Sequence, residues 1–269
     1  MTALAVEQQE VHVRAPRAVP SRVPMTRVIG VEARKMFDTR SGFWLMTSIV
    51  IAAVGATAAV ILFAPDKALT YDTFAAAIGF PMSVILPMIA ILSVTSEWSQ
   101  RSGLTTFTLV PHRGRVIAAK AAAALAVGVL SIPLAFAVGA LGNVLGTTIA
   151  GTDMVWDVSL VHGLYIVLGN VLGMAVGFML GVLFRNSAGA IVTYFVFSLL
   201  LPTLSGVLAT NQAGYRDVQP WVDFNYAQGA VFNGDMSGAQ WAHLATAGGI
   251  WLLLPLLVGL TLVMRTEVK

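Results

Sequence analysis

Six long stretches of this chain are almost entirely apolar, and each is long enough to cross a lipid bilayer. A helix rises about 1.5 Å per residue, so about 20 apolar residues cross a hydrocarbon core about 30 Å thick. The strands of a membrane barrel are about 10 residues long and alternate in polarity, which these stretches do not. The predicted fold class is therefore an all-α integral membrane protein with six transmembrane helices. The predicted spans cover residues 44–63, 74–95, 118–141, 161–183, 189–209 and 245–264.

The composition agrees with this fold class and excludes several kinds of chemistry. Hydrophobic residues make up 57% of the chain and charged residues 11%, against about 25% charged residues in a soluble domain. The chain has no cysteine, its four histidines are scattered, and it has no G-x-x-x-x-G-K-[ST] phosphate loop. The sequence therefore predicts no metal site, no bound cofactor and no enzyme activity in this chain.

The basic residues predict the orientation of the chain in the membrane. If residues 1–43 lie in the cytosol, fourteen of the sixteen Lys and Arg residues fall on the inner side, and only Lys67 and Arg216 fall outside. Cytoplasmic segments of membrane proteins carry such an excess of Lys and Arg. We therefore expect both termini to be cytoplasmic. The net charge of +3 then reflects topology, and no nucleic-acid partner is expected.

Two segments precede the first span. Residues 1–24 contain scattered prolines and arginines with few large apolar residues, which predicts a disordered cytosolic tail. Residues 25–43 favour an amphipathic helix that lies in the inner headgroup region, although a simple helical extension of the first span is the alternative. Its apolar face would consist of Ile29, Ala33, Met36 and Phe37.

The apolar stretches carry few groups that suit ion coupling. Apart from Lys120, which belongs to the charged segment 96–120, they contain no Asp, Glu, Lys or Arg. Ion-coupled transporters usually keep ionisable groups at membrane depth, so an energy source outside this chain is favoured.

The fourth span carries a stripe of glycines at every fourth position. Residues at this spacing share one helix face and allow a second helix to approach closely. The approaching helix belongs either to the same subunit or to a second one, and the sequence leaves both open. The stripe consists of Gly169, Gly173, Gly177 and Gly181.

The segment 96–120, with a loop predicted at 96–117, mixes charged side chains with large apolar ones. This mixture suits a protein contact, although Phe107 and Leu109 could instead lie in the lipid interface. The order of residues resembles the segment after the second span in the type-2 family of ABC transporter permeases. There an acidic residue is followed by Gly-Thr, a leucine, Pro-x-Arg and a lysine. The matching residues are Glu97, Arg101, Gly103, Thr106, Leu109, Pro111, Arg113 and Lys120, with Leu104 inserted between the glycine and Thr105.

The resemblance implies a function. Such permeases are membrane subunits of exporters in the bacterial cytoplasmic membrane, with ATP and Mg²⁺ bound by two copies of a separate ATPase subunit. Six spans are half of the usual twelve, so a second copy or a similar permease is implied. A lipophilic or amphipathic cargo would suit the apolar spans. The alternatives are a stand-alone secondary transporter and a non-transporting membrane scaffold or sensor. The residues implied to dock the ATPase are Glu97, Arg101, Gly103, Thr106, Leu109, Pro111 and Arg113, with Arg34, Lys35 and Phe37 of the N-terminal helix.

The predicted external segment, 210–243, is rich in aromatic residues. The resemblance implies short re-entrant helices that close the outer end of a pathway, and an aromatic belt at the membrane interface is the alternative. Ser237 and Gln240 have the spacing of a capping box, which predicts that the last helix begins there. The aromatic gate or interface residues are Trp221, Phe224, Tyr226 and Trp241.

Overall fold

The computed structural model describes residues 23–99 and 113–265, and every regular element in these two ranges is a helix. Six of the described helical segments are long and apolar enough to cross a membrane, which confirms the predicted fold class at this level. They are Gly42–Phe63, Tyr71–Trp98, Arg113–Ala150, Leu160–Phe184, Ser187–Asn211 and Gly238–Arg265. The predicted tail at 1–24 lies almost entirely outside the described residues, as do residues 100–112 of the predicted docking loop.

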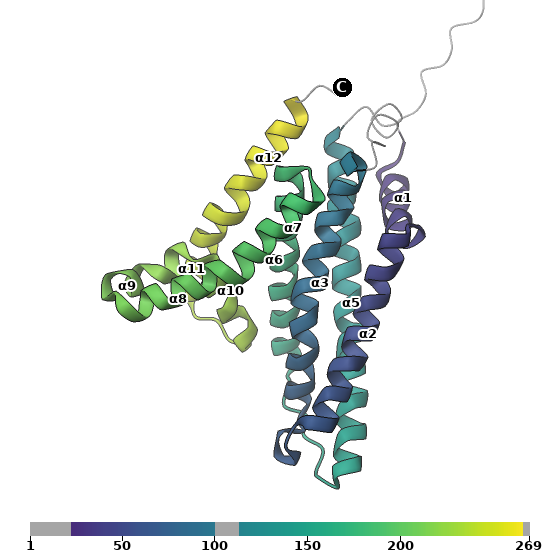
Figure 1. Ribbon diagram of the computed structural model, residues 1–269, viewed down its shortest axis with the longest axis vertical. Coiled ribbons are helices and arrows are strands. Elements are labelled where there is room, and N and C mark those ends of the chain that lie inside the picture. Colours follow the sequence, from purple (N-terminus) through teal and green to yellow (C-terminus); the bar gives the residue numbers. More distant parts are fainter. Residues whose placement is uncertain (1–22, 100–112, 266–269) are drawn as a thin grey trace, which may run out of the picture.

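The first part of the chain forms an elongated bundle, shown in Figure 1 from purple to teal. The short helix α1 is separated from α2 by Thr39, whose extended backbone breaks the helix and whose side chain caps α2 by accepting from the Gly42 N–H. The short η1 turn joins α2 to α3. The elements are α1 (Met25–Asp38), α2 (Arg40–Phe63), η1 (Asp66–Ala68), α3 (Tyr71–Ser99), α5 (Arg113–Ala150) and α6 (Leu160–Phe184).

The second part of the chain leans away from this bundle, so that α8 and α9 lie to one side of it (Figure 1). Short helices dominate here, and the predicted external segment folds into several of them. The elements are α7 (Ser187–Phe195), η2 (Val196–Leu200), α8 (Leu201–Asn211), α9 (Ala213–Val222), α10 (Phe224–Gly229), η3 (Ala230–Asn233), α11 (Gly238–Gly248), η4 (Gly249–Leu253) and α12 (Leu254–Arg265).

Two helices are longer than predicted, and they extend into both ends of the predicted docking loop. Helix α3 is still helical at Ser99, and α5 is already helical at Arg113 and continues for 38 residues to Ala150. At about 1.5 Å per residue α5 is about 57 Å long, nearly twice the thickness of a hydrocarbon core. The charged residues Glu97 and Lys120 do not end these helices, because each is paired inside the bundle as described below.

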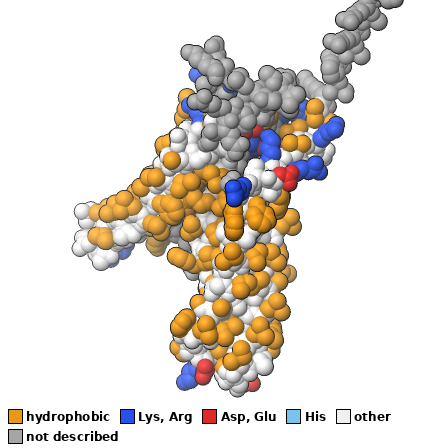
Figure 2. Space-filling view, turned by 45° about the vertical axis from the view of Figure 1, so that its right-hand side comes forward, with side chains coloured by type: hydrophobic (Ala, Val, Ile, Leu, Met, Phe, Trp, Pro, Cys, Tyr) orange, Lys and Arg blue, Asp and Glu red, His pale blue; other side chains and the backbone are white. Residues whose placement is uncertain are grey.

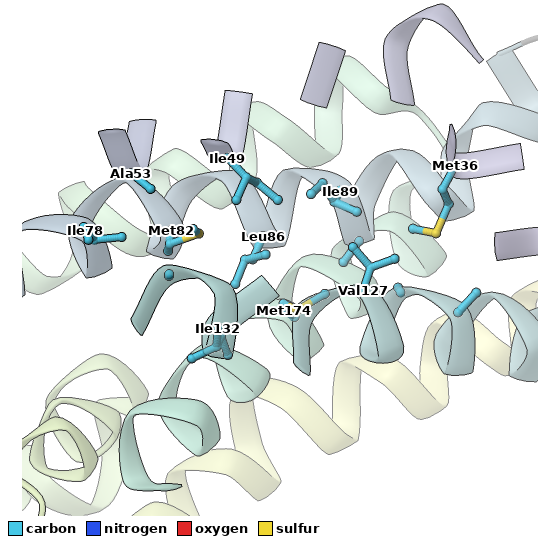
Figure 3. Packing of buried hydrophobic residues seen from close by; sticks show 14 residues of the cluster. Met36, Ile49, Ala53, Ile78, Met82, Leu86, Ile89, Val127, Ile132 and Met174 are labelled. Atoms are coloured by element: carbon cyan, nitrogen blue, oxygen red, sulfur yellow. The ribbon is translucent and has the colours of Figure 1, made fainter. Parts of the chain in front are cut away.

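One of two equally large groups of buried apolar side chains lies where α2, α3, α5 and α6 meet (Figure 3). Ile49 of α2, Leu86 of α3, Val127 of α5 and Met174 of α6 belong to it. Met36 extends the group to α1. The cluster joins the N-terminal helix to the first four spans in one packed unit.

The glycine stripe of α6 packs inside this chain. A Cβ atom at Gly177 would lie 2.5 Å from the carbonyl oxygen of Pro87 in α3, and one at Gly169 would lie 2.5 Å from the ring of Phe232. Real Cβ atoms do not come this close, so helix α6 can reach α3 at this distance only because residue 177 is a glycine. Of the two alternatives left open by the sequence, the structure has the packing within one subunit.

The fifth and sixth membrane-crossing segments each contain a π-helical turn, η2 and η4. Both turns are followed directly by a leucine and a proline, Pro202 in α8 and Pro255 in α12. A proline in a helix lacks an N–H and its ring clashes with the carbonyl four residues earlier, and a wider turn relieves this clash. The two turns lie side by side, because the rings of Phe197 and Trp251 are 5.7 Å apart between their centroids.

Candidate functional site

Four charged side chains from three helices meet at the end of the bundle where α3 and α5 are joined by residues 100–112. Lys120 Nζ of α5 lies 2.6 Å from Glu32 Oε2 of α1 and 3.3 Å from Glu97 Oε1 of α3. Lys35 Nζ of α1 lies 2.7 Å from Glu32 Oε1 and 3.3 Å from Glu97 Oε1. We call Glu32, Lys35, Glu97 and Lys120 the inner charge cluster. It ties α1 to the ends of the second and third spans.

Three members of this cluster are buried. The side chains of Glu32, Glu97 and Lys120 are 6%, 5% and 3% exposed, whereas that of Lys35 is 43% exposed. Buried charges are tolerated only when they are paired, and two carboxylates with two ammonium groups make this set neutral. Lys120 also donates a hydrogen bond of 3.0 Å to the carbonyl oxygen of Ser93. By contrast, Glu97 Oε2 is buried and has no hydrogen-bond partner.

The cluster shifts the titration of its exposed member. Partial burial lowers the pKa of Lys35, but the hydrogen bond to Glu32 and the charges of Glu32 and Glu97 outweigh this effect. The pKa of Lys35 is therefore raised above its ordinary value of 10.5. The ammonium group stays charged throughout the neutral range.

Helix α1 contributes its carboxylate because of its spacing. Val28, Glu32 and Met36 follow one another at intervals of four residues, so they share one face, and all three are buried. This face packs against α5 and α2. Two residues of the predicted apolar face of α1 lie in different environments. Met36 is buried, while the side chain of Phe37 is 53% exposed.

Further contacts gather around the same end of the molecule. Arg113, at the described start of α5, donates from Nη1 to the carbonyl oxygen of Val263 in α12 at 3.0 Å. Arg115 donates from Nη2 to the carbonyl oxygen of Val23, just before α1, at 2.6 Å. Figure 2 shows Lys and Arg side chains beside the grey segments at this end, above a surface that is mostly hydrophobic.

Apart from Arg113, whose contact with Val263 is given above, the predicted docking residues fall into three groups. Arg34 and Phe37 are exposed on α1, and Lys35 is half-exposed in the inner charge cluster. Glu97 is buried in that cluster, so its carboxylate faces α1 and α5. The other predicted residues, Arg101, Gly103, Thr106, Leu109 and Pro111, lie outside the described residues.

The sequence analysis did not predict Glu32 as a site residue, and it placed Lys120 at the start of a helix without predicting an ion-pair partner for it. Two signals in the sequence indicate them. A glutamate takes the middle position of an apolar face on α1, between Val28 and Met36, and a lysine follows the first apolar residues of the third span. These two residues meet across a separation of 88 positions in the sequence.

The predicted outer aromatic residues occupy different environments. Phe224 is 1% exposed and packs among Phe197 and other buried residues, so it is part of the core. Trp221, Tyr226 and Trp241 are between 41% and 53% exposed. The predicted capping box is confirmed, since Ser237 and Gln240 exchange both hydrogen bonds at the start of α11.

No protein-family model matches this chain, and no curated protein matches it either. The resemblance to type-2 ABC permeases therefore depends on the residue order from Glu97 to Lys120 and on the six-span architecture.

Proposed function

We propose that this protein is the permease subunit of an ATP-driven exporter in the bacterial cytoplasmic membrane, with both termini in the cytosol. A separate ATPase subunit, present in two copies, acts on its inner face, and a second permease completes the transporter. The observation that carries this proposal is the inner charge cluster. It fastens α1 to α3 and α5 beside the segment whose sequence resembles an ATPase-docking loop.

The cluster couples α1 mechanically to the spans, so that a displacement caused by a cytosolic partner is passed on to them. A displacement of α1 acts on α5 through the pair of Glu32 and Lys120, and on α3 through the pair of Lys35 and Glu97. These helices also share an apolar cluster with α2 and α6, so they move as packed units rather than as independent side chains. Such coupling requires that the nucleotide state of the partner favours one arrangement of the spans over another.

A second candidate, an ion-coupled secondary transporter, is favoured by one feature of the same cluster. The carboxylate of Glu97 is buried inside a membrane-crossing helix and keeps one oxygen without a partner. Buried ionisable groups of this kind also serve as proton relays. The two candidates differ in whether a second protein is needed.

Co-purification tests the first candidate directly. The full-length protein is isolated from native membranes, and co-purifying chains are screened by mass spectrometry for a phosphate-loop sequence and for ATPase activity. Reversing the charge of the exposed Arg34 together with Phe37→Ala should lower the recovered ATPase at least tenfold. Lys67→Glu, an equally exposed charge reversal in η1, is the control and should leave recovery unchanged. Equal recovery with all three proteins would contradict the proposed docking surface.

Everted vesicles separate the two candidates. Uptake of a fluorescent amphipathic dye should require ATP and should persist when an ionophore abolishes the ion gradients. Uptake that needs no ATPase and stops with the ionophore would instead establish the secondary transporter.

A further inference from the structure

A cavity of about 300 Å³ lies inside the chain, between the spans and the short helices of the second part. One wall is built by α3, α6 and α7 with η2, and the facing wall by the start of α8, by α10 and by η3. Six of its lining side chains can form hydrogen bonds, and none of its lining residues is charged. The six are Ser83, Asn170, Tyr194, Ser198, Asn225 and Gln228.

Each of these six side chains donates one hydrogen bond inside the protein. Asn170 Nδ2, Asn225 Nδ2 and Gln228 Nε2 donate to the carbonyl oxygens of Ile166, Phe197 and Gly169 at 2.8, 3.0 and 2.8 Å. The hydroxyls of Ser83, Tyr194 and Ser198 likewise donate to backbone carbonyls at 2.7, 2.7 and 2.8 Å. Each of the three amide nitrogens keeps a second N–H, and the side chains also keep acceptor oxygens, so the lining can both donate to a ligand and accept from it.

One of these oxygens has no partner at all. Asn170 is 6% exposed, it lies near the middle of the membrane-crossing helix α6, and its Oδ1 accepts no hydrogen bond. A buried acceptor without a partner is destabilising, and groups this polar at membrane depth are kept for function. Asn170 lines the cavity, so a turn of its amide toward the cavity would let a ligand hydroxyl or amide N–H supply the missing donor.

The remaining lining narrows the kind of ligand. No lining residue is charged, so an anion or a cation would be buried without a counter-charge. Phe197 and Phe232 add aromatic surfaces against which the C–H faces of a sugar ring can pack. The volume lies at the lower end for small-molecule sites, so it suits one headgroup rather than a whole lipid.

The cavity adjoins a second, more open groove. Pro202 and Asn225 line both spaces, and the groove, of about 530 Å³, continues along α8, α9 and α10 past Arg216 and Asp223. A headgroup in the cavity therefore has a polar path along the outer short helices.

We propose that this cavity binds a neutral, hydroxyl-rich headgroup, with Asn170 Oδ1 accepting one of its hydroxyl hydrogens. The headgroup belongs either to a glycolipid or to a free sugar, which share this chemistry. The inference deepens the proposed function by naming the class of cargo, and it rests on that function only for the step from binding to transport.

Binding is tested without any ATPase, so a failure here is distinct from a failure of the exporter proposal. The full-length protein is placed in phosphatidylcholine nanodiscs, and its thermal unfolding is followed with monoglucosyl-diacylglycerol, phosphatidylglycerol, free glucose or NaCl. The glycolipid, or glucose in the case of a soluble cargo, should raise the unfolding temperature, and phosphatidylglycerol and NaCl should not. The Kd obtained from the titration should rise about tenfold in Asn170→Leu, the effect of one lost hydrogen bond of about 1.4 kcal/mol.

The chain offers a matched control. Asn143 of α5 is also fully buried, donates from Nδ2 to the Val155 carbonyl at 2.9 Å and has an unpartnered Oδ1, but it does not line the cavity. Asn143→Leu should leave the Kd unchanged. If Asn170→Leu fails to fold, Gly173→Val serves in its place. A Cβ there would meet only ordinary contacts at 3.6 and 3.7 Å, so the added methyl groups fill the cavity and should abolish the shift.

Three results would overturn the proposal. The first is an unfolding temperature that neither glycolipid nor glucose changes, as expected if only water fills the cavity. The second is an equal rise with the anionic lipid. The third is a sodium-dependent rise that is lost in Asn170→Leu.

Discussion

The burial of Glu32 and Glu97 in the bundle depends on Lys120. Its ammonium group is the buried partner of both Glu32 and Glu97, while the fourth member, Lys35, is partly solvated. A carboxylate left in the bundle without a cation would be far less stable than one in water. The neutrality of the inner charge cluster is thus a condition for α1 to lie against the spans.

Removal of this ammonium group should therefore destabilise the inner end of the bundle. We expect Lys120→Met to lower the free energy of unfolding by about 3–5 kcal/mol, since it leaves buried carboxylates under-paired. Thermal unfolding of the purified protein measures the loss. Lys67→Met, at an exposed lysine, is the control and should change little. An equal unfolding temperature for both variants would show that the cluster does not hold α1 in place.

Lys35 gives the cluster a defined pH dependence. Its pKa is raised in the folded protein, so its stabilising contribution is fully present below the unfolded value of 10.5 and is lost as pH rises through the folded pKa. We expect α1 to stay fastened at neutral pH and to loosen only above about pH 10.5. The chain has no cysteine, so a spin label on Arg34→Cys reports this motion alone. Lys35→Met should remove the alkaline transition, and a transition near neutral pH would contradict this assignment.

At the scale of elements, the paired π-helical turns stand out as the places where two spans deviate from regular helix. Each precedes a proline, and together they bound the segment of α8 to α11 that forms one wall of the cavity. A segment that is joined to the rest of the chain through two adjacent wide turns is suited to move as a unit.

Replacement of Pro202 should straighten the first of these turns. Alanine restores an N–H and removes the ring, so a regular α-helix becomes possible across residues 196–202. We expect Pro202→Ala to slow amide hydrogen exchange of this segment at least fivefold, measured by mass spectrometry on the purified protein. Pro133→Ala, in α5, is the control, because no π-helical turn precedes that proline. Unchanged exchange at 196–202 would mean that the proline is not what opens the turn.

At the scale of the whole molecule, charge and apolar surface are separated. Charged side chains gather at the ends, and large apolar residues such as Leu62, Phe80 and Leu130 are more than 70% exposed along the spans. In a membrane such residues face lipid or a second subunit, so their exposure is what a multi-pass protein requires. The second part of the chain leans away from the bundle, and its short elements α10 and η3 contact α6.

The number, type and approximate bounds of the spans could be predicted from the sequence, because a run of about 20 apolar residues is a local property and a bilayer leaves few alternatives to a helix. The fourth span was predicted at 161–183 and is observed at Leu160–Phe184. The capping box at Ser237 was equally local. The bounds differ at the end of the second span and the start of the third, since Glu97 and Arg113 are both helical although they lie outside the predicted spans.

Only the tertiary structure decided what these elements contain between them. The glycine stripe alone does not tell which helix it faces, and the structure places Pro87 of α3 against Gly177. Asn170 and Gln228 line the same cavity because Gln228 hydrogen-bonds to Gly169, which is 59 residues away in the sequence. Hydrophobic periodicity places residues on a face of their own helix, but it carries no information about which face of another helix they meet. The candidate site and the cavity consist of such long-range contacts, whereas the six spans follow from the chain alone.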